Sequence, residues 1–400
     1  MSHERTSPVQ AMAHGQTRAP RMMARMDFLY GVVPALLLVV GILLAWLCLR
    51  RVFSLRLRAF STVRKIAEGI VLSLIALVVL ALGLNSAVNA VILHHYRAQM
   101  PGALYVVDGH RMRLDCTGSG SPTLVLDAGL GNDGLIFSAV QPTLAKTTRV
   151  CSYDRAGMGW SDPVSTPRDA DHIADQLHGL LQAAGISGPI VLMGHSIAGM
   201  YIRDYATRYP GQVAGLIFID ASTPWQNRDP ALSKAMRPGG PPLRVRLLTQ
   251  AMFVLGIPRW MSGCSQPFPA FDPARAKLQA EERCHLVVSS PAGESTNFDR
   301  SGKETIHTGP YGDLPVLVFT SDPALAAKFH EPSDMRAAWD RMQANLKNLS
   351  THSRQIIAAN AGHYIQLDRA GLINREVPIF IQQIRGTAPP PAVWGTTTTE

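Results

Sequence analysis

Charged side chains are scarce in this chain of 400 residues, at 17%, whereas apolar residues make up 46%. Soluble domains carry about 25% charged residues, so the deficit indicates membrane-embedded segments. The net charge of +9 is concentrated at one end, because residues 1–65 hold ten basic and only two acidic side chains. The remainder is nearly balanced and lacks the basic face of a nucleic-acid-binding domain, so we exclude nucleic acid as a partner.

Cysteine and histidine clusters with the spacing of a zinc site are absent, as are internal repeats. Structural zinc sites need closely spaced pairs of these residues. We therefore expect no metal, and the residues discussed below call for no other cofactor.

Two long stretches contain no charged residue, at positions 28–49 and 69–93. Each reaches the roughly 20 residues that a helix needs to cross the hydrocarbon core of a bilayer. A buried helix of a soluble protein rarely runs so long without a charge, and the apolar run of a signal peptide is shorter. We predict a membrane anchor of two transmembrane helices over residues 28–99, preceded by a basic tail at 1–27.

The segment between the two stretches, 50–65, carries six basic residues and no acidic one. Short loops rich in Lys and Arg stay on the cytoplasmic side of a membrane. We therefore predict a two-span membrane protein whose large C-terminal domain lies outside the cytoplasm. Arg18, Arg21 and Arg25 of the tail favour the opposite orientation.

From about residue 100 to 386, short apolar runs alternate with helical patterns. This alternation predicts an α/β domain with a mostly parallel, eight-stranded sheet and helices on both faces. Asp108-Gly109 between the first two runs is typical of a hairpin. The predicted strands are Ala103–Val107, Arg111–Cys116, Thr123–Asp127, Arg149–Tyr153, Pro189–Met193, Ala214–Ile219, Pro315–Thr320 and Arg354–Ala358. The predicted helices include residues 169–184, 197–208, 333–348 and 371–384.

Residues 222–312 interrupt this alternation, and a connection of that length indicates a functional lid. Within it, residues 243–262 mix apolar and basic side chains. They could lie on a membrane surface, but a lid helix that packs on the core is the favoured interpretation. Residues 387–400 are rich in Pro and Thr, and we expect them to be disordered.

Ser196 is the candidate nucleophile. The predicted strand 189–193 runs into Gly194-His195-Ser196-Ile197-Ala198-Gly199, and a helical pattern follows. A strand, a sharp turn and a helix are the setting of a nucleophile elbow, in which small residues let a strained serine project its hydroxyl. Ala198 departs from the usual G-x-S-x-G, but alanine still allows close approach of helix and strand.

A serine hydroxyl needs a base that takes its proton and an acid that orients the base. His363 follows the last strand of the sheet and is the candidate base. Asp322, directly after the seventh strand, is the favoured acid, and Asp220, which ends the sixth strand, is the rival. The backbone amides of Ile197 and of Leu130, in the loop 127–131, are the candidate oxyanion donors.

These motifs resemble the α/β-hydrolase superfamily over residues of about 100–386. The shared stretches are DAGLG at 127–131, SYDRAGMGWS at 152–161, GHSIAG at 194–199 and the late Gly362-His363. The resemblance implies an α/β-hydrolase fold from the branch with esterases, lipases, haloperoxidase-like and peptidase-like members, in which Asp154 and Arg155 are structural. Many relatives have His-Gly where this chain has Ala128-Gly129. Relatives that dehalogenate or open epoxides use an aspartate nucleophile, so Ser196 argues against both activities.

The family's strand order also bears on the cysteines. It places the second strand beside the fourth, so Cys116 and Cys151 would be neighbours, and Cys264 and Cys284 share the lid. A domain outside the cytoplasm permits two disulfides. Buried thiols are the equal alternative.

The sequence thus predicts a membrane-anchored serine hydrolase that cleaves an ester, or a related acyl substrate, through an acyl-enzyme on Ser196. An amphiphilic substrate fits a lid held near the bilayer by the anchor. The same triad also serves amidases, peptidases and cofactor-free perhydrolases. A catalytically dead binding module at the membrane is the alternative from another class.

Overall fold

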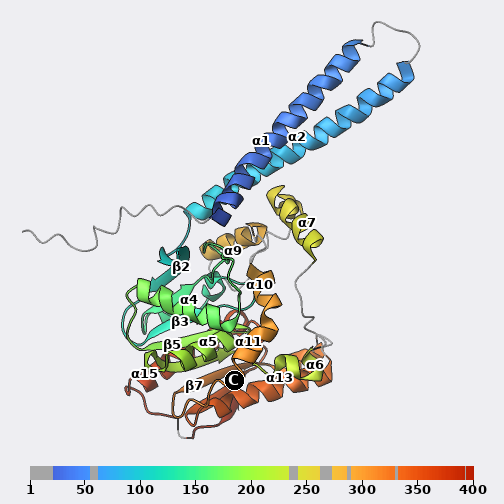
Figure 1. Ribbon diagram of the computed structural model, residues 1–400. Coiled ribbons are helices and arrows are strands. Elements are labelled where there is room, and N and C mark those ends of the chain that lie inside the picture. Colours follow the sequence, from blue (N-terminus) through green and yellow to red (C-terminus); the bar gives the residue numbers. More distant parts are fainter. Residues whose placement is uncertain are drawn as a thin grey trace, which may run out of the picture.

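The computed structural model describes residues 21–54, 62–233, 242–261, 273–285, 290–328, 332–391 and 393–400. The predicted tail up to residue 20, residues 55–61 of the basic loop and Cys264 lie outside the described residues. Two apolar helices, α1 (Arg21–Ser54) and α2 (Thr62–Ala98), project from a domain built on one sheet (Figure 1).

The projecting helices α1 and α2 form an antiparallel pair. Segments Tyr30–Arg50 and Ile66–Ala98 are long and apolar enough to cross a membrane. The helices approach closely at Gly41, where an added Cβ would lie 2.7 Å from the side chain of Leu80. At the domain end, Tyr96 of α2 stacks on Trp160 with ring centroids 4.6 Å apart. This contact fixes the base of the pair to the sheet domain.

The sheet has nine strands in the order β1-β2-β4-β3-β5-β6-β7-β8-β9. Only β1–β2 and β2–β4 pair antiparallel, so the sheet is mostly parallel as predicted. The bounds are β1 (Ala103–Val107), β2 (His110–Thr117), β3 (Thr123–Asp127), β4 (Val150–Tyr153), β5 (Ile190–His195), β6 (Val213–Ile219), β7 (Val316–Ser321), β8 (Ser353–Ala358) and β9 (Thr397–Thr399).

The ninth strand corrects the expectation that residues 387–400 are disordered. Thr397–Thr399 pair parallel with β8, and Nζ of Lys347 donates to Oγ1 of Thr397 at 2.6 Å. The three threonines are exposed and present no apolar alternation. Their strand forms because β8 would otherwise leave an open edge of backbone donors and acceptors.

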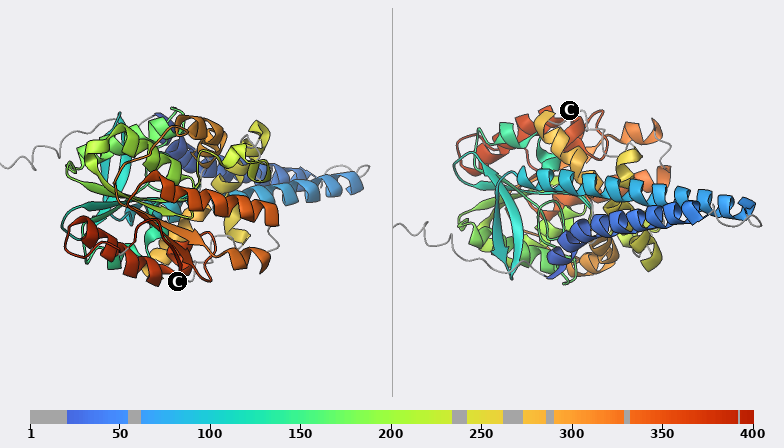
Figure 2. Two further views of the ribbon diagram at one scale, coloured as in Figure 1. Left: turned by 90° about the horizontal axis from the view of Figure 1, so that it is seen from below. Right: turned by 90° about the horizontal axis from the view of Figure 1, so that it is seen from above.

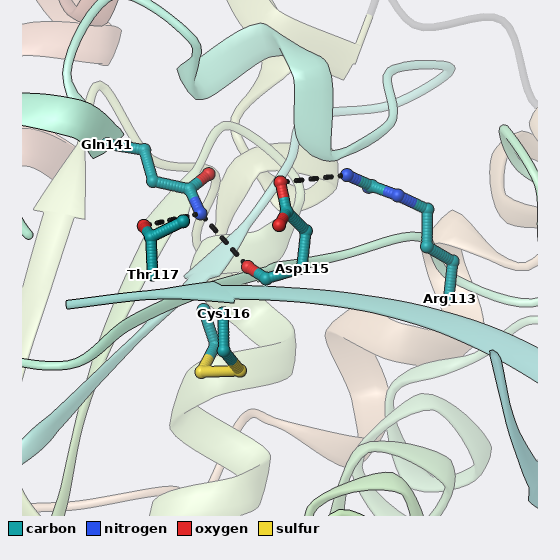
Figure 3. The surroundings of a disulfide bond; sticks show 6 residues. Arg113, Asp115, Cys116, Thr117 and Gln141 are labelled. Atoms are coloured by element: carbon teal, nitrogen blue, oxygen red, sulfur yellow. Dashed lines mark hydrogen bonds and ion pairs between the residues drawn. A yellow bond between two sulfur atoms is a disulfide. The ribbon is translucent and has the colours of Figure 1, made fainter. Parts of the chain in front are cut away.

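The antiparallel edge is joined by a tight turn and a disulfide. Asp108 and Gly109 have φ values of 49° and 78°, as a two-residue turn between twisted strands requires. Cys116 of β2 and Cys151 of β4 are registered partners and form a disulfide with a Cα–Cα distance of 4.0 Å (Figure 3). Cys284 is disulfide-bonded as well. The sequence left disulfides and buried thiols as alternatives, and in the structure Cys116, Cys151 and Cys284 are disulfide-bonded.

Helices cover both faces of the sheet (Figure 2). On one face, β3 and β5–β8 pack against a layer that includes α15 (Ala370–Ile384), α3 (Gln141–Leu144) and α14 (Ile365–Asp368). On the other face lie α4 (Ala170–Ala183) and α5 (Ala198–Arg208). Parallel strands end at one edge of such a sheet, and loops there form the site.

The predicted lid is a helical insertion between β6 and β7. It begins near the sheet, continues beside α1 and α2, and returns to the sheet (Figure 1). Its helices are α6 (Pro230–Ser233), α7 (Leu243–Val254), α8 (Ile257–Trp260), α9 (Pro273–His285), α10 (Ser290–Thr296) and α11 (Phe298–Glu304). After β7 come α12 (Pro323–Lys328) and α13 (Ser333–Asn345).

Candidate active site

Ser196 lies in the sharp turn between β5 and α5. Its φ of +55° is in the left-handed region, which is strained for a residue with a side chain. The turn fits because its neighbours are small: an added Cβ on Gly194 would lie 2.9 Å from the carbonyl oxygen of Ala198. One on Gly199 would lie 2.6 Å from Cβ of Ala221. Ala198 itself is fully buried at the start of α5, so the departure from glycine is accommodated.

His363 contacts both Ser196 and an acid. Its Nε2 lies 3.0 Å from Oγ of Ser196, and its Nδ1 lies 2.7 Å from Oδ2 of Asp220. The three side chains follow β5, β6 and β8, which end at the same edge of the sheet. With Nδ1 protonated toward the carboxylate, Nε2 is free to accept the serine proton.

Asp220 is buried and is held for this contact by three hydrogen-bond donors. Its Oδ1 accepts hydrogen bonds from the amide of Ser321 at 3.0 Å, the hydroxyl of Ser321 at 2.9 Å and Nε1 of Trp339 at 3.0 Å. Burial by itself would raise the pKa of Asp220, but the hydrogen bond and charge of His363, with the donors from Ser321 and Trp339, hold that pKa below its ordinary value. Asp220 is therefore a carboxylate.

Asp322, the favoured acid of the sequence analysis, does not pair with His363. Its Oδ1 accepts from the amide of Ala324 and its Oδ2 from the amide of Asn360, both at 2.8 Å. The carboxylate of Asp322 is thus hydrogen-bonded to the first turn of α12 and to the loop after β8. Asp220 has a φ of +39° just after β6, and its Oδ2 reaches His363 instead. The structure therefore contradicts the preference for Asp322 and pairs His363 with Asp220.

His195 is a buried residue whose contact the sequence did not predict. Its Nε2 lies 2.9 Å from the backbone oxygen of His363, to which it donates. Burial, followed by the charge of His363, lowers the pKa of His195 to about 3, so the ring is neutral. The ring also fills the space beside Gly129, where an added Cβ would lie 2.7 Å from Nδ1. Its position next to the nucleophile was the only available signal.

Arg155 joins the loop after β3 to the lid. Its guanidinium donates to Oδ1 of Asp127 and the backbone oxygen of Ala128, both at 2.6 Å, and to that of Gly129 at 2.8 Å. The same group contacts both carboxylate oxygens of Glu294 in α10, at 2.7 and 2.9 Å. Burial opposes the charge, but the carboxylates of Glu294 and Asp127 raise the pKa of Arg155. The family resemblance implied a structural role for Arg155, whereas no sequence motif pointed to Glu294.

A cavity of about 380 Å³ opens beside Ser196 and His363. Leu130 and Ile197, the candidate oxyanion residues, both line it. Its other apolar lining comes from the lid and from α12 and α13, and Gln226 adds a buried amide. The apolar residues are Leu232, Phe298, Leu325, Met335 and Trp339. Within the described part of the chain, no three His, Cys, Asp or Glu side chains group so that they could hold a metal.

Comparison with known proteins agrees with this geometry. The model of the Alpha/beta hydrolase family matches residues 124–376. The chain belongs to the α/β-hydrolase family. The match includes Ser196, Asp220 and His363 and the strands β5, β6 and β8 that precede them.

Curated relatives share parts of this α/β hydrolase. An uncharacterized Schizosaccharomyces pombe protein, C23C11.06c, is 33% identical over 153 residues, which are 31% of this chain and 29% of that protein. The uncharacterized protein YbdG of Bacillus subtilis is 31% identical over 41% of this chain and 52% of its own length. The chain thus spans about half or less of these relatives. The putative carbamate hydrolase RutD of Cronobacter turicensis is 26% identical over 61% of this chain and 85% of its length.

Solved structures show the same fold. A membrane phospholipase A, described as a bacterial virulence factor, has a TM-score of 0.50 and 19% identity, covering 80% of this chain and 99% of its own. Wild-type DBJA has a TM-score of 0.52 and 18% identity, covering 72% of this chain and all of its own. At these identities the likeness extends to the fold alone.

Proposed function

We propose that this protein is a membrane-anchored serine hydrolase that cleaves an ester through an acyl-enzyme on Ser196. The hydrogen-bonded series Ser196–His363–Asp220 is the observation that carries the proposal. Nucleophile, base and acid occur in the chain order Ser, Asp, His of this family's triads. Relatives named as hydrolases, such as the putative carbamate hydrolase RutD, support the same reaction class.

In the first half-reaction, Oγ of Ser196 attacks the ester carbonyl while Nε2 of His363 takes the hydroxyl proton. The negative charge that develops on the carbonyl oxygen is met by the amides of Ile197 and Leu130 at the cavity wall. The C–O bond then breaks, and His363 returns the proton to the leaving alcohol. Asp220 stabilises the imidazolium throughout.

In the second half-reaction, water attacks the acyl-enzyme and gives its proton to His363. The tetrahedral adduct collapses, the acid product leaves, and the proton returns to Ser196. No cofactor enters either step. The largely apolar cavity favours a hydrocarbon acyl group, and its size suits a short chain or the end of a longer one.

The anchor and the compartment are part of the proposal. Two helices long and apolar enough to span a membrane support an anchor over residues 28–99. The disulfide Cys116–Cys151 supports a catalytic domain outside the cytoplasm, because disulfides persist in oxidising compartments. Both fit an amphiphilic ester as substrate and the lipid bilayer as partner.

A fluorophosphonate probe tests the chemistry, since it reacts with an activated serine. We expect full-length protein in detergent to be labelled and to hydrolyse a soluble short-chain ester. Ser196→Ala should abolish both, whereas Ser222→Ala, a serine that lines the same cavity, should retain labelling. Persistent labelling of the Ser196→Ala variant would refute the assignment.

The reaction subclass needs a panel of substrates, because the same triad serves several reactions. Rates of ester hydrolysis, aminoacyl amide hydrolysis and peracid formation, measured side by side, distinguish an esterase from an amidase, a peptidase or a perhydrolase. A folded protein that neither reacts with the probe nor turns over any substrate would favour the catalytically dead binding module.

A further inference from the structure

The lid links the candidate active site to the apolar helix pair. It starts at the cavity, where Leu232 of α6 contributes to the wall, and it returns there with Phe298 of α11. Between these points α7 and α9 pack against α2 (Figure 1). The same insertion therefore contacts the substrate cavity at its two ends and the proposed anchor in its middle.

Three polar side chains of α2 bind the C-terminal end of α7. Each donates to a backbone carbonyl at the end of α7 or at Leu255 directly after it, where a helix has few internal donors left for its carbonyls. We call this set of contacts the α2–α7 junction. Its pairs are Asn85 Nδ2 with the oxygen of Leu255, Ser86 Oγ with that of Val254 at 2.8 Å, and Asn89 Nδ2 with that of Phe253 at 2.9 Å.

The junction explains why polar residues occur in an otherwise apolar helix. Unpaired polar groups at membrane depth are costly, and here the polar side chains of α2 are paired with backbone carbonyls. Oδ1 of Asn89 also accepts from Nε of Arg259 at 2.7 Å. The approach is close enough that an added Cβ on Gly256, whose φ is +72°, would lie 2.7 Å from Nδ2 of Asn85.

Most of the exposed side chains described on α7 are apolar. Leu248 is 64% exposed, and Val245, Leu247 and the following Trp260 are exposed as well. On α2, at the level of the junction, Leu84 is 62% exposed and Val88 is also exposed. Both helices that meet at the junction therefore expose large apolar side chains, and clusters of such side chains indicate an interaction site.

The helix pair sets the depth of the junction. Gly41 packs against Leu80, so in this antiparallel pair Arg50 lies level with Val71. Counting the roughly 20 residues of a hydrocarbon core from that level places its far boundary near Val91. The junction lies within about 10 Å of that boundary, the depth at which interfacial helices bury their apolar side. Exposed Arg244 in the first turn of α7 suits anionic lipid headgroups.

We infer that α7 with Trp260 is a membrane-contacting surface of the lid, held by the α2–α7 junction at the lipid boundary nearest the catalytic domain. The lid then delivers an acyl ester from the bilayer to Ser196, so the substrate class is a membrane-resident ester with a long acyl chain. This substrate class rests on the proposed catalytic function, and the contact of α7 with lipid rests only on the proposed anchor.

The contact of α7 with lipid can be tested without an activity measurement. A Cys48→Ala background leaves the disulfide cysteines in place, and an environment-sensitive fluorophore is attached at Leu248→Cys or at Ile379→Cys, an exposed apolar position on α15. The full-length protein is placed in phosphatidylcholine–phosphatidylglycerol liposomes that contain doxyl-labelled lipid. We expect quenching of at least about twofold at position 248 and none at 379. Equal quenching at both positions overturns the inference.

The junction is tested by Asn85→Leu combined with Asn89→Leu in the same labelled protein. We expect quenching at position 248 to fall to the level at 379, while hydrolysis of a soluble butyrate ester stays within about twofold of the parent. Retained quenching would show that α7 contacts lipid without the junction, which overturns the inferred role of α2.

The substrate class is tested on the exposed surface, where substitution does not threaten folding. Leu248→Asp should lower hydrolysis of a long-chain fluorogenic ester embedded in liposomes by about tenfold, because a carboxylate is repelled by anionic headgroups and is costly to bury among acyl chains. Ile379→Asp should not, and neither variant should change hydrolysis of the soluble ester. Equal effects of both variants on the embedded ester overturn the inference and leave the proposed function intact.

Absence of any Ser196-dependent hydrolysis by the parent refutes the proposed function, and the quenching result still stands.

Discussion

Nδ1 of His363 lies 2.7 Å from Oδ2 of Asp220, while the carboxylate of Asp322, which follows the neighbouring strand, accepts from the amides of Ala324 and Asn360. Two aspartates thus end two adjacent parallel strands, and only one contacts the base. The difference has a direct kinetic consequence.

Asp220→Asn should lower kcat for a soluble ester by about 10³–10⁴-fold, because an amide favours the wrong tautomer of His363 and cannot stabilise the imidazolium. Asp322→Asn should stay within about threefold of the parent, because in the described part of the chain its carboxylate accepts from the amides of Ala324 and Asn360 and not from His363. The measurement is steady-state hydrolysis together with the rate of fluorophosphonate labelling. A larger loss from Asp322→Asn than from Asp220→Asn would contradict the geometry.

Glu294→Gln should lower kcat by about tenfold, because it weakens the contact by which Arg155 holds the loop that carries Leu130. As a positioning effect it should leave KM for a small soluble ester nearly unchanged. Asp229→Asn is the matched control, since it removes another lid ion pair, with exposed Arg341. If Glu294→Gln lowered thermal stability but left kcat unchanged, Glu294 would have a structural role and would not position the loop for catalysis.

Asp204 in α5 gives a prediction about pH. Burial, and then the charge of Asp171, raise its pKa to about 7 in the folded protein. The unfolded chain releases the proton near pH ~4. The stability from this group is therefore fully present below about pH 4 and is lost as the pH rises to 7. We expect Asp204→Asn to stabilise the protein by about 1–2 kcal/mol at pH 8, after allowance for solvent screening, and by little at pH 5. Apparent Tm values in detergent across this range provide the check, and a gain independent of pH would argue against the raised pKa.

The disulfide Cys116–Cys151 closes a loop with a sequence separation of 35. Cys116→Ala with Cys151→Ala should lower the apparent Tm by roughly 5–10 °C, because the unfolded chain regains the entropy of that loop. Activity at 25 °C should persist, since the disulfide lies at the antiparallel edge and not in the cavity. Adding a reductant to this variant separates the contribution of the Cys284 disulfide. An unchanged Tm would mean that the disulfide does not form in the native protein.

The eight strands from Ala103 to Ala358 could be predicted because each carries its own apolar run, and burial in a parallel sheet leaves that run in the local sequence. Thr397–Thr399 have no such signature, because their strand depends on the free edge of β8. The lid shows the same limit. The sequence favoured a lid helix at 243–262 that packs on the core. In the structure the end of α7 contacts Asn85, Ser86 and Asn89 of α2, about 165 residues earlier in the chain.

The amino-acid sequence by itself determined the apolar helices, the order of strands and helices, the family resemblance and the candidates Ser196 and His363. Each of these depends on patterns within one short segment. Only the tertiary structure decided between Asp220 and Asp322, joined Arg155 to Glu294 and brought α7 to α2. Those outcomes depend on side-chain direction and backbone dihedral angles at the ends of neighbouring elements, where a turn of a few tens of degrees moves a carboxylate by several ångströms. The contacts that define the candidate site are long-range, so the fold has to form before the acid, the lid and the anchor can meet.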